Sequence, residues 1–247
     1  MKKIVYESKY YKRGLRLSFF DLINYFALKI NTRMLINKFG HGKKIIEIGC
    51  GKGEISKELS NFGYVVDAVD VSKEAILLAK RKKSKVNFLL GDVFILKRTD
   101  NYYDHVFSFH VMEHIKDIEK TLFEVKRILK IGGKFIVRIP NSNSFEAKIA
   151  GKDWFHWDEP YHVNHFSDFE FVDLLKKSGF KEISINYHLF EFRQVLLYSL
   201  ITKMFKLKSI NNFWKYISMP LQFIFVPISC FLGFFKNSGT IEITSMK

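Results

Sequence analysis

Three closely spaced glycines stand where an apolar run gives way to a more polar segment. They are Gly49, Gly51 and Gly53 in the stretch EIGCGKGEIS. Glycine accepts backbone angles that other residues avoid, and it lets a ligand approach the chain closely. If a helix begins after the turn, its free N–H groups and the positive end of its dipole favour a carboxylate. The spacing therefore predicts a turn that binds a small ligand carrying such a group.

An acidic residue follows the turn at the distance that dinucleotide-binding folds use. Asp70 lies 21 residues after Gly49, at the end of a second apolar run, where a carboxylate can hold ribose hydroxyls. The dinucleotide fingerprint G-x-G-x-x-G would need glycine at position 54, and this chain has Glu54. The pattern therefore counts against NAD as the ligand.

A second group of reactive side chains lies in the run HVMEHIKD. His110, Glu113 and His114 fall within five residues and match the metal motif H-x-x-E-H literally. That motif needs one helix to present its ligands, whereas this run leaves a strand and crosses a loop. We therefore predict no metal here and expect side chains that hold backbone groups, with an ion on Glu113 and His114 as the alternative.

The stretch 140–167 is rich in aromatic and imidazole side chains. They include Trp154, His156, Trp157, Tyr161, His162 and His165. Histidine is the side chain whose ordinary pKa lies near neutrality, so it can take a proton from an acceptor hydroxyl. The alternative is that the aromatic residues pack this stretch onto a sheet and the histidines cap turns.

These residues need a scaffold that brings strand ends together. Short β-branched runs alternate with amphipathic stretches from residue 43 onward, which is typical of βαβ units around a parallel sheet. The expected strands are 43–49, 64–70, 85–92, 104–110, 133–140, 181–190 and 239–247. The expected helices include 17–39, then 117–130 ended by Gly132 and Gly133, and one that runs from a Ser167–Glu170 capping box to Gly179. We expect a doubly wound, mostly parallel α/β sheet of seven strands that binds ligands at the carboxyl ends of its strands.

We expect four regions along the chain. An N-terminal helical cap (1–42) precedes a core (43–190) that contains a substrate-binding insertion (140–167). An apolar helical excursion (191–238) then separates the core from the final strand of its sheet (239–247).

The order of these motifs resembles the cofactor site of class I methyltransferases, which use S-adenosylmethionine (SAM). The likeness covers roughly residues 40–190 and depends on E-x-G-x-G-x-G, then VD at a second strand end, then GDV at a third. It implies a Rossmann-like fold, SAM as cofactor and methyltransferase activity. The residues expected at the SAM site are Glu47, Gly49, Cys50, Gly51, Gly53, Asp70, Val71, Asp92, Val93 and His110.

The resemblance also assigns roles to these residues. In that family the glycine turn wraps the methionine part of SAM, and Glu47 would order the loop from below. Asp70 would accept hydrogen bonds from both ribose hydroxyls, because an ionised carboxylate has acceptors and no donor. Asp92 would accept from the adenine amino group, with Val71 packed on the adenine ring and Val93 beside it.

The acceptor side resembles two groups of methyltransferases. V-x-E-H-x-x-D after the fourth strand is found in ubiquinone-type and polysaccharide-cluster enzymes. In some quinone O-methyltransferases an acid replaces His110 and joins the Glu-His pair in holding a divalent ion. W-x-x-x-x-x-P-x-H-x-x-H-F-S, residues 154–167, is similar to families that act on sugars, lipids and cell-envelope glycans. The resemblance implies O-methylation of a small-molecule acceptor that is a glycan, lipid-linked or quinone-like. The candidates for taking its proton are His162, His165 and His114.

The chain is strongly basic, with 40 Lys and Arg against 25 Asp and Glu and a formal charge of +15. Such an excess attracts nucleic acid or an anionic lipid surface, and charge alone does not choose between them. An RNA methyltransferase is therefore an alternative, but no aromatic and basic RNA-reading module accompanies the KRKKSK run at 80–85. We do not expect nucleic acid as a partner. A SAM-binding scaffold without catalysis is the other alternative, and the intact turn with both aspartates argues against it.

Residues 216–235 form a run of twenty residues without a charge, long enough to span a membrane. Pro220 and Pro227 would break one continuous helix. A single crossing would also leave the final strand on the wrong side of the membrane. We therefore expect 191–238 to lie in the interface of an anionic membrane, with a lid over the acceptor pocket or a dimer contact as alternatives.

The cysteines and the N-terminal residues bear on the cellular compartment of the protein. Cys50 and Cys230 are far apart in sequence and offer neither a metal-ligand spacing nor a disulfide framework. The first twenty residues lack the apolar core of a secretory signal. We expect a cytoplasmic protein that is peripheral on the inner face of the membrane.

Overall fold

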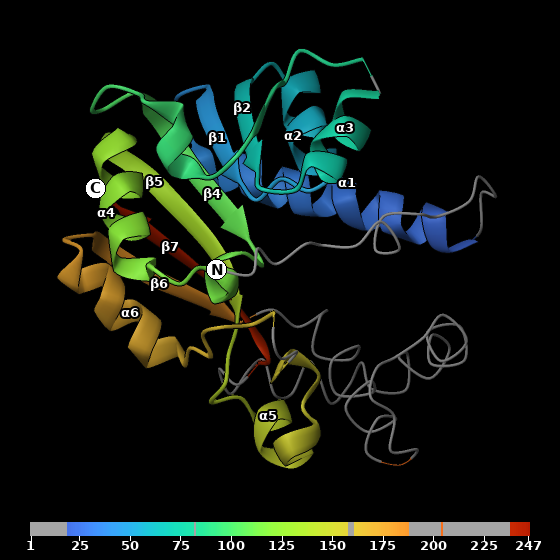
Figure 1. Cartoon of the computed structure of the whole chain (residues 1–247), viewed down its shortest axis with the longest axis vertical. Helices are drawn as coiled ribbons and strands as arrows, with labels where there is room; N and C mark the ends of the chain where they lie inside the picture. The colour runs from blue at the N-terminus through green and yellow to red at the C-terminus, as the bar shows by residue number, and fades with distance from the viewer. Residues whose placement is uncertain (1–18, 82, 158–160, 188–203, 205–237) are drawn as a thin grey trace. The chain divides into compact units, whose positions relative to one another are not determined.

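The computed structural model describes residues 19–81, 83–157, 161–187, 204 and 238–247 (Figure 1). Its strands are β1 (Lys44–Ile48), β2 (Val65–Asp70), β3 (Asn87–Leu90), β4 (Tyr103–Phe109), β5 (Leu129–Pro140), β6 (Lys181–Tyr187) and β7 (Thr240–Met246). Its helices are α1 (Phe19–Phe39), α2 (Glu54–Asn61), α3 (Lys73–Arg81), α4 (Ile118–Ile128), α5 (Phe145–Ala150) and α6 (Asp168–Lys177). The strands form one sheet in the order β3-β2-β1-β4-β5-β7-β6, which confirms the expected α/β fold.

The chain divides into two compact units, of which the first contains the start of the sheet. This unit comprises Met1–Phe109, Lys120–Ile136 and Met246–Lys247. Within it, β1 pairs in parallel with β2 and β4, and β2 pairs in parallel with β3. Nearly all of β1 and β2 is buried, as expected for parallel strands covered on both faces. The carboxyl ends of β1, β2 and β3 therefore lie along one edge, where the glycine turn and both aspartates follow them.

The N-terminal helix α1 (Phe19–Phe39) agrees with the expected helix at 17–39 over the residues that the structure describes. It ends at Phe39, and Gly40 follows with a φ of 70°. The Gly40 N–H donates to the carbonyl oxygen of Ile36 at 3.4 Å, a common way to end a helix. Leu35 and Phe39 are buried in the core of the first unit, so the last turns of α1 are held by packing.

The second unit comprises His110–Glu119 and Val137–Ser245. β7 runs antiparallel to β5, because Gly132 pairs with Lys247 while Asn141 pairs with Gly239. The sheet is therefore mixed at this end. The buried guanidinium of Arg138 on β5 forms an ion pair with Glu242 on β7 at 2.9 Å, which links the two strands by charge.

The boundary between α4 and β5 differs from the expectation. The helix ends at Ile128, and β5 begins at Leu129, so Gly132 and Gly133 lie inside the strand and do not end the helix. The cause is the C-terminus, since the Lys247 N–H donates to the Gly133 carbonyl oxygen at 3.1 Å and extends the pairing of β5. A Cβ at Gly133 would lie 2.6 Å from the carbonyl oxygen of Asp104, so the glycine allows two strands to approach closely.

The later elements agree with the sequence where the structure describes them. The Ser167–Glu170 capping box is present at the start of α6, and strands follow at β6 and β7. Most of the expected apolar excursion (191–238) and the first residues of the N-terminal cap lie outside the described residues. In the part of the chain that the structure describes, no helix is both long enough and apolar enough to cross a membrane.

Candidate functional site

The glycine turn leaves β1 at its carboxyl end and leads directly into α2. Gly49 and Gly53 have φ of 76° and 68°, in the left-handed region that suits glycine. The N–H groups of Gly49 and Cys50 both donate to the carbonyl oxygen of Val69, at 2.7 and 3.1 Å. Because Val69 is on β2, the neighbouring strand holds the start of the turn in place.

Two glycines of the turn have different surroundings. A Cβ at Gly53 would lie 2.3 Å from a ring atom of Phe88, whereas a Cβ at Gly51 would meet nothing within 4 Å. Gly53 therefore allows the turn to pack against β3. Gly51 instead borders open space that a ligand can occupy.

Asp70 at the end of β2 braces this turn. One carboxylate oxygen accepts from the Gly51 N–H at 2.7 Å, and the other accepts from the Ser72 N–H at 2.8 Å. A carboxylate offers about four acceptor positions, so lone pairs remain for further donors. The side chain is half-buried, which leaves it accessible from the edge of the sheet.

Glu47 lies beneath the turn, on β1. Its carboxyl group is buried and accepts a short hydrogen bond from the hydroxyl of Ser56, on α2. Burial raises the pKa of Glu47 to about 8, although the Ser56 hydrogen bond acts in the opposite direction. Glu47 thus joins the strand before the turn to the helix after it.

Raising the pH from 5 to 8 is expected to destabilise the unliganded protein through Glu47. Because its pKa is about 8 in the fold and near 4.5 in the unfolded chain, the folded state keeps a proton that the unfolded state releases. The contribution of Glu47 to stability is therefore fully present below about pH 4.5 and is lost as the pH rises to about 8. Urea titrations at several pH values should show a smaller loss for Glu47→Gln than for the natural protein. Equal slopes would contradict this account, while a residual slope is expected from Glu146, whose pKa burial raises to about 7.

The residues expected on the adenine side are Asp92 and two valines, of which one is exposed and one is buried. Asp92 accepts from the Phe94 N–H at 2.9 Å and caps a short 3-10 helix, Val93–Leu96. Val71 is 64% exposed and offers an apolar surface, whereas Val93 is 2% exposed and packs in the core. The thiol of Cys50 is also buried, and burial raises its pKa, so we expect any SAM contact of Cys50 to come from its backbone.

His110 belongs to a different unit of the chain from the other expected SAM residues. The glycine turn and both aspartates belong to the first unit, whereas His110 begins the second. It adopts a left-handed backbone with φ 55°, and its N–H donates to the Arg138 carbonyl oxygen at 2.9 Å. Its ring nitrogen Nδ1 lies 3.5 Å from Glu113 Oε1, so the side chain is directed at the carboxylate of the second unit.

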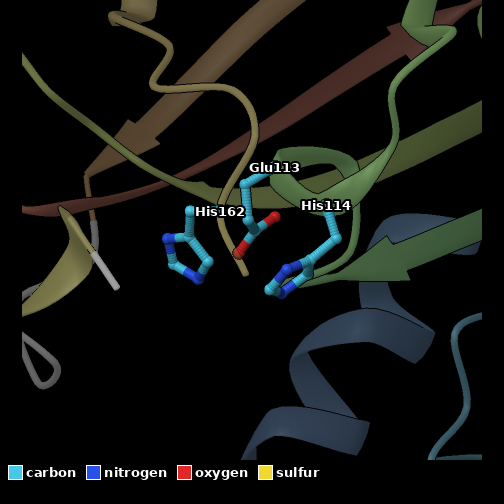
Figure 2. Close-up of side chains that lie close together, drawn as sticks. All are labelled: Glu113, His114 and His162. Atoms are coloured by element: carbon cyan, nitrogen blue, oxygen red, sulfur yellow. The ribbon is translucent and has the colours of Figure 1, made fainter. Parts of the chain in front are cut away.

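The loop after β4 and the end of the insertion are tied together around Glu113. The N–H groups of Val163 and Asn164 both donate to the Glu113 carbonyl oxygen, at 2.9 and 3.0 Å. The Asn164 side-chain amide also donates to the Ile115 carbonyl oxygen at 2.6 Å. These contacts bring His162 beside Glu113 and His114, as Figure 2 shows.

The Glu113 side chain is buried at the centre of this group. It is 1% exposed, and neither carboxylate oxygen has a hydrogen-bond partner among the described residues. Burial is the largest single effect and opposes ionisation, but His110, His114 and a backbone contact together outweigh it, so the pKa of Glu113 is lowered from its ordinary value. The carboxylate is therefore a buried negative charge next to several imidazoles.

Two of these imidazoles have a defined tautomer. His114 Nδ1 lies 2.8 Å from the Tyr161 carbonyl oxygen, and His162 Nδ1 lies 2.7 Å from the His156 carbonyl oxygen. A carbonyl oxygen only accepts, so each Nδ1 carries the hydrogen. In the neutral ring the lone pair is then on Nε2. The two ring centroids are 4.6 Å apart.

One tryptophan of the insertion packs against apolar residues, and another contacts a histidine ring. Trp154 is buried and packs with Ala147 and Ala150 of α5, which belongs to the insertion itself. The half-buried ring of Trp157 donates from Nε1 to the Gly151 carbonyl oxygen at 2.8 Å. The His165 ring stands edge-on to Trp157, with the centroids 4.8 Å apart.

Comparison with known proteins decides the family. A family model for a methyltransferase domain matches residues 11–185, a range that includes the glycine turn, both aspartates and the histidines of the insertion. The protein belongs to the class I SAM-dependent methyltransferases. Its cofactor is S-adenosylmethionine.

Relatives of this methyltransferase carry more than one kind of activity in their names. It is 26% identical to phosphoethanolamine N-methyltransferase 2 of Caenorhabditis elegans, over 66% of its own chain and 39% of the relative. It is 29% identical to a ubiquinone biosynthesis O-methyltransferase of Coxiella burnetii, over 52% of its own chain and 55% of the relative. The methyltransferase thus spans about half or less of the length of these relatives. A SAM-dependent methyltransferase structure from Thermotoga maritima shares the fold, with a TM-score of 0.60, 21% identity and 92% of each chain covered.

Sequence reasoning did not include Glu113 among the site residues of the methyltransferase. It assigned Glu113 to backbone contacts, and the backbone carbonyl of that residue does hold the insertion. The side chain, however, is buried without such a partner among the described residues. The available signal was an acid between Met112, an apolar residue, and His114, within the literal H-x-x-E-H run.

Proposed function

We propose that this methyltransferase moves the methyl group of SAM to a hydroxyl oxygen of a small acceptor, which is sugar-based, lipid-linked or quinone-like. The observation that supports this most is the tautomer of His114 and His162. Both rings donate their Nδ1 hydrogen to a backbone carbonyl oxygen, so Nε2 is the atom that can take a proton. An acceptor hydroxyl has such a proton to give.

The reaction is a direct displacement. The acceptor oxygen attacks the methyl carbon, the bond from that carbon to sulfur breaks, and S-adenosylhomocysteine leaves with the sulfur electron pair. The hydroxyl proton passes to a histidine of the cluster, for which His114, His162 and His165 are the candidates. Holding the acceptor in line with the methyl group and excluding water supplies much of the acceleration.

The cofactor roles follow the geometry of the first unit. The open space beside Gly51 would take the methionine part of SAM, and the remaining lone pairs of Asp70 would accept from the ribose hydroxyls. Asp92 would accept from the adenine amino group, and exposed Val71 would pack on the ring. Glu47 would keep the turn in shape through Ser56.

The acceptor class is tested by labelling. The protein is incubated with SAM labelled in the methyl group and with cell extract separated into lipid, glycan and RNA fractions. We expect label in the lipid or glycan fraction and, after hydrolysis, in a methyl ether. Label in RNA would replace the proposal with RNA methylation, and a labelled amine would replace it with N-methylation. SAM binding without label in any fraction would favour a scaffold.

Replacing His162 or His165 with alanine is expected to lower methyl transfer while leaving SAM affinity within about twofold. A general base contributes about 100-fold or more, but positioning still operates in the variants, so a partial loss of about 10- to 100-fold is expected. Transfer is measured into the fraction that the natural protein labels, and SAM affinity by calorimetry. His41→Ala is the control, because His41 is an exposed histidine outside the cluster. A loss of SAM affinity as large as that of Asp70→Ala would contradict the assignment to the acceptor side.

We also propose, from the sequence of residues 191–238, that the protein contacts anionic membranes. The support is the uncharged run at 216–235 with Lys203, Lys206, Lys208, Lys215 and Lys236 around it. The protein should float with anionic vesicles at low salt, and a variant lacking 191–238 should not. Equal flotation of both would favour a lid or a dimer contact for this segment.

A further inference from the structure

Three side chains with metal-binding atoms meet in the second unit. Glu113, His114 and His162 each place one ligand atom within 4.8 Å of the ligand atoms of the other two. Figure 2 shows the Glu113 carboxylate between the two imidazoles. Glu113 and His114 come from the loop after β4, and His162 comes from the insertion. Residues separated by almost fifty positions therefore converge on one point.

The buried carboxylate of Glu113 independently favours a cation at this point. It is 1% exposed, and neither of its oxygens has a hydrogen-bond partner among the described residues. His110 Nδ1 lies 3.5 Å from Oε1 and forms an ion pair with it only when the ring is protonated. A buried carboxylate is costly unless it is paired, hydrogen-bonded or bound to a metal. A cation bound between the three side chains would satisfy this group.

The histidines are arranged as metal ligands usually are. A metal-binding histidine typically donates its second ring N–H to a carbonyl or carboxylate, which fixes the tautomer and the ring orientation. His114 does this with the Tyr161 carbonyl oxygen, and His162 does it with the His156 carbonyl oxygen. Both rings thus direct the nitrogen that can bind a metal, Nε2, away from the backbone contact.

We propose that Glu113, His114 and His162 bind a divalent transition-metal ion such as Zn²⁺ or Co²⁺. One carboxylate and two imidazoles suit these borderline ions, whereas Mg²⁺ and Ca²⁺ favour sites made of oxygen ligands. Three protein ligands leave at least one coordination position open. This inference reverses the prediction from the sequence, which treated the literal H-x-x-E-H match as accidental and expected no metal there. His162, which lies outside that match, takes the third ligand position.

The ion would have two consequences for this unit. It would join the insertion to the loop after β4 more firmly than the hydrogen bonds of Val163 and Asn164 do alone. The second consequence depends on the proposed function: an acceptor hydroxyl bound at the open position would lose its proton more readily. His114 and His162 would then serve as ligands, and His165 would remain as the proton acceptor.

The site is tested by metal binding to the full chain, without a histidine tag and after treatment with a chelator. Calorimetry should show one equivalent of Zn²⁺ or Co²⁺ bound, and Mg²⁺ bound far more weakly. Glu113→Gln and His162→Ala should each weaken Zn²⁺ binding by at least about tenfold. His165→Ala and His41→Ala are the matched controls and should leave metal affinity unchanged. SAM affinity and the melting temperature of every variant report whether it still folds.

A sulfur ligand gives a direct signature of His162. In His162→Cys the thiolate should replace the imidazole, retain Zn²⁺, and add a sulfur-to-metal absorption band to the Co²⁺ spectrum. This variant carries the test if Glu113→Gln does not fold. Failure of the natural protein to bind one equivalent of Zn²⁺ or Co²⁺, or Co²⁺ spectra that are identical for the natural protein and His162→Cys, would overturn the proposal.

These outcomes are distinct from those of the proposed function. Metal binding with no label in lipid or glycan fractions would overturn the O-methylation proposal and leave the metal site standing. If the protein binds no metal and label transfer survives chelation, the metal-site proposal would be overturned and the O-methylation proposal would stand.

Discussion

Replacing Gly53 with alanine is expected to destabilise the protein by about 3 kcal/mol. The residue has a φ of 68°, where a side chain costs about 1–2 kcal/mol, and its Cβ would lie 2.3 and 2.5 Å from two ring atoms of Phe88. Phe88 is 5% exposed, so its ring has no open space to enter, and such overpacking costs about 1–3 kcal/mol. For a chain of this size the sum corresponds to a melting temperature lower by roughly 6–12 °C, which calorimetry would measure.

Gly51→Ala is the matched control, which we expect to lower stability less and to weaken SAM binding. Gly51 also has a positive φ, 52°, but a Cβ there would meet nothing within 4 Å. We therefore expect a smaller destabilisation, about 1 kcal/mol, from backbone strain alone. Because the open space beside Gly51 is where we place SAM, this variant should lose SAM affinity despite its higher melting temperature. Equal melting temperatures for the two variants would contradict the role of Phe88.

The second large effect is expected at Asp70. Asp70→Ala removes the acceptor that we assign to the ribose hydroxyls, and hydrogen bonds to a charged group contribute about 1.5–3 kcal/mol each. It also removes the carboxylate that accepts from the Gly51 and Ser72 N–H groups. Because each step of about 1.4 kcal/mol is a tenfold change in affinity, the loss of one such bond predicts SAM binding about 10- to 100-fold weaker in calorimetry, and the loss of both predicts a larger effect.

Two comparisons make the Asp70 result specific. Asp100→Ala removes a carboxylate that is 68% exposed and paired with Arg127, and it should leave SAM affinity unchanged. NAD should not bind the natural protein, because Glu54 stands where the dinucleotide fingerprint needs glycine. Unchanged SAM affinity in Asp70→Ala would limit Asp70 to bracing the turn, and binding of NAD in place of SAM would overturn the ligand assignment.

The sequence alone predicted those elements whose conformation is determined by their own residues. Apolar runs of strand length and amphipathic stretches alternate along the chain, so the parallel strands of the first unit and the capped α6 could be placed from their own residues. The glycine turn could be placed for the same reason, since positive backbone angles favour glycine. The turn and the ordered aspartates at the following strand ends then gave the resemblance to class I methyltransferases, which implied SAM.

Contacts between distant segments were not visible in the sequence. β5 begins at Leu129, four residues before the strand expected from the glycines, because the backbone of Lys247 pairs with Gly132 and Gly133. Val93, which the resemblance places beside the adenine, has a side chain that is only 2% exposed in the fold. The start of β5 was thus determined by a segment far away in the chain.

The histidine-rich part of the site shows the same difference between what nearby residues determine and what distant segments determine. The sequence singled out His114, His162 and His165 from the chemistry of imidazole. It disfavoured a metal, because the run around Glu113 does not lie on one helix, and kept an ion on Glu113 and His114 as the alternative. The absence of such a helix is confirmed, since Met112–His114 is a single short 3-10 helix. The tertiary structure supplies the third group from the insertion, held by two N–H donors at the Glu113 carbonyl oxygen. Residue types and spacing thus determine which side chains are able to act, whereas burial, tautomer and convergence arise only when distant segments pack together.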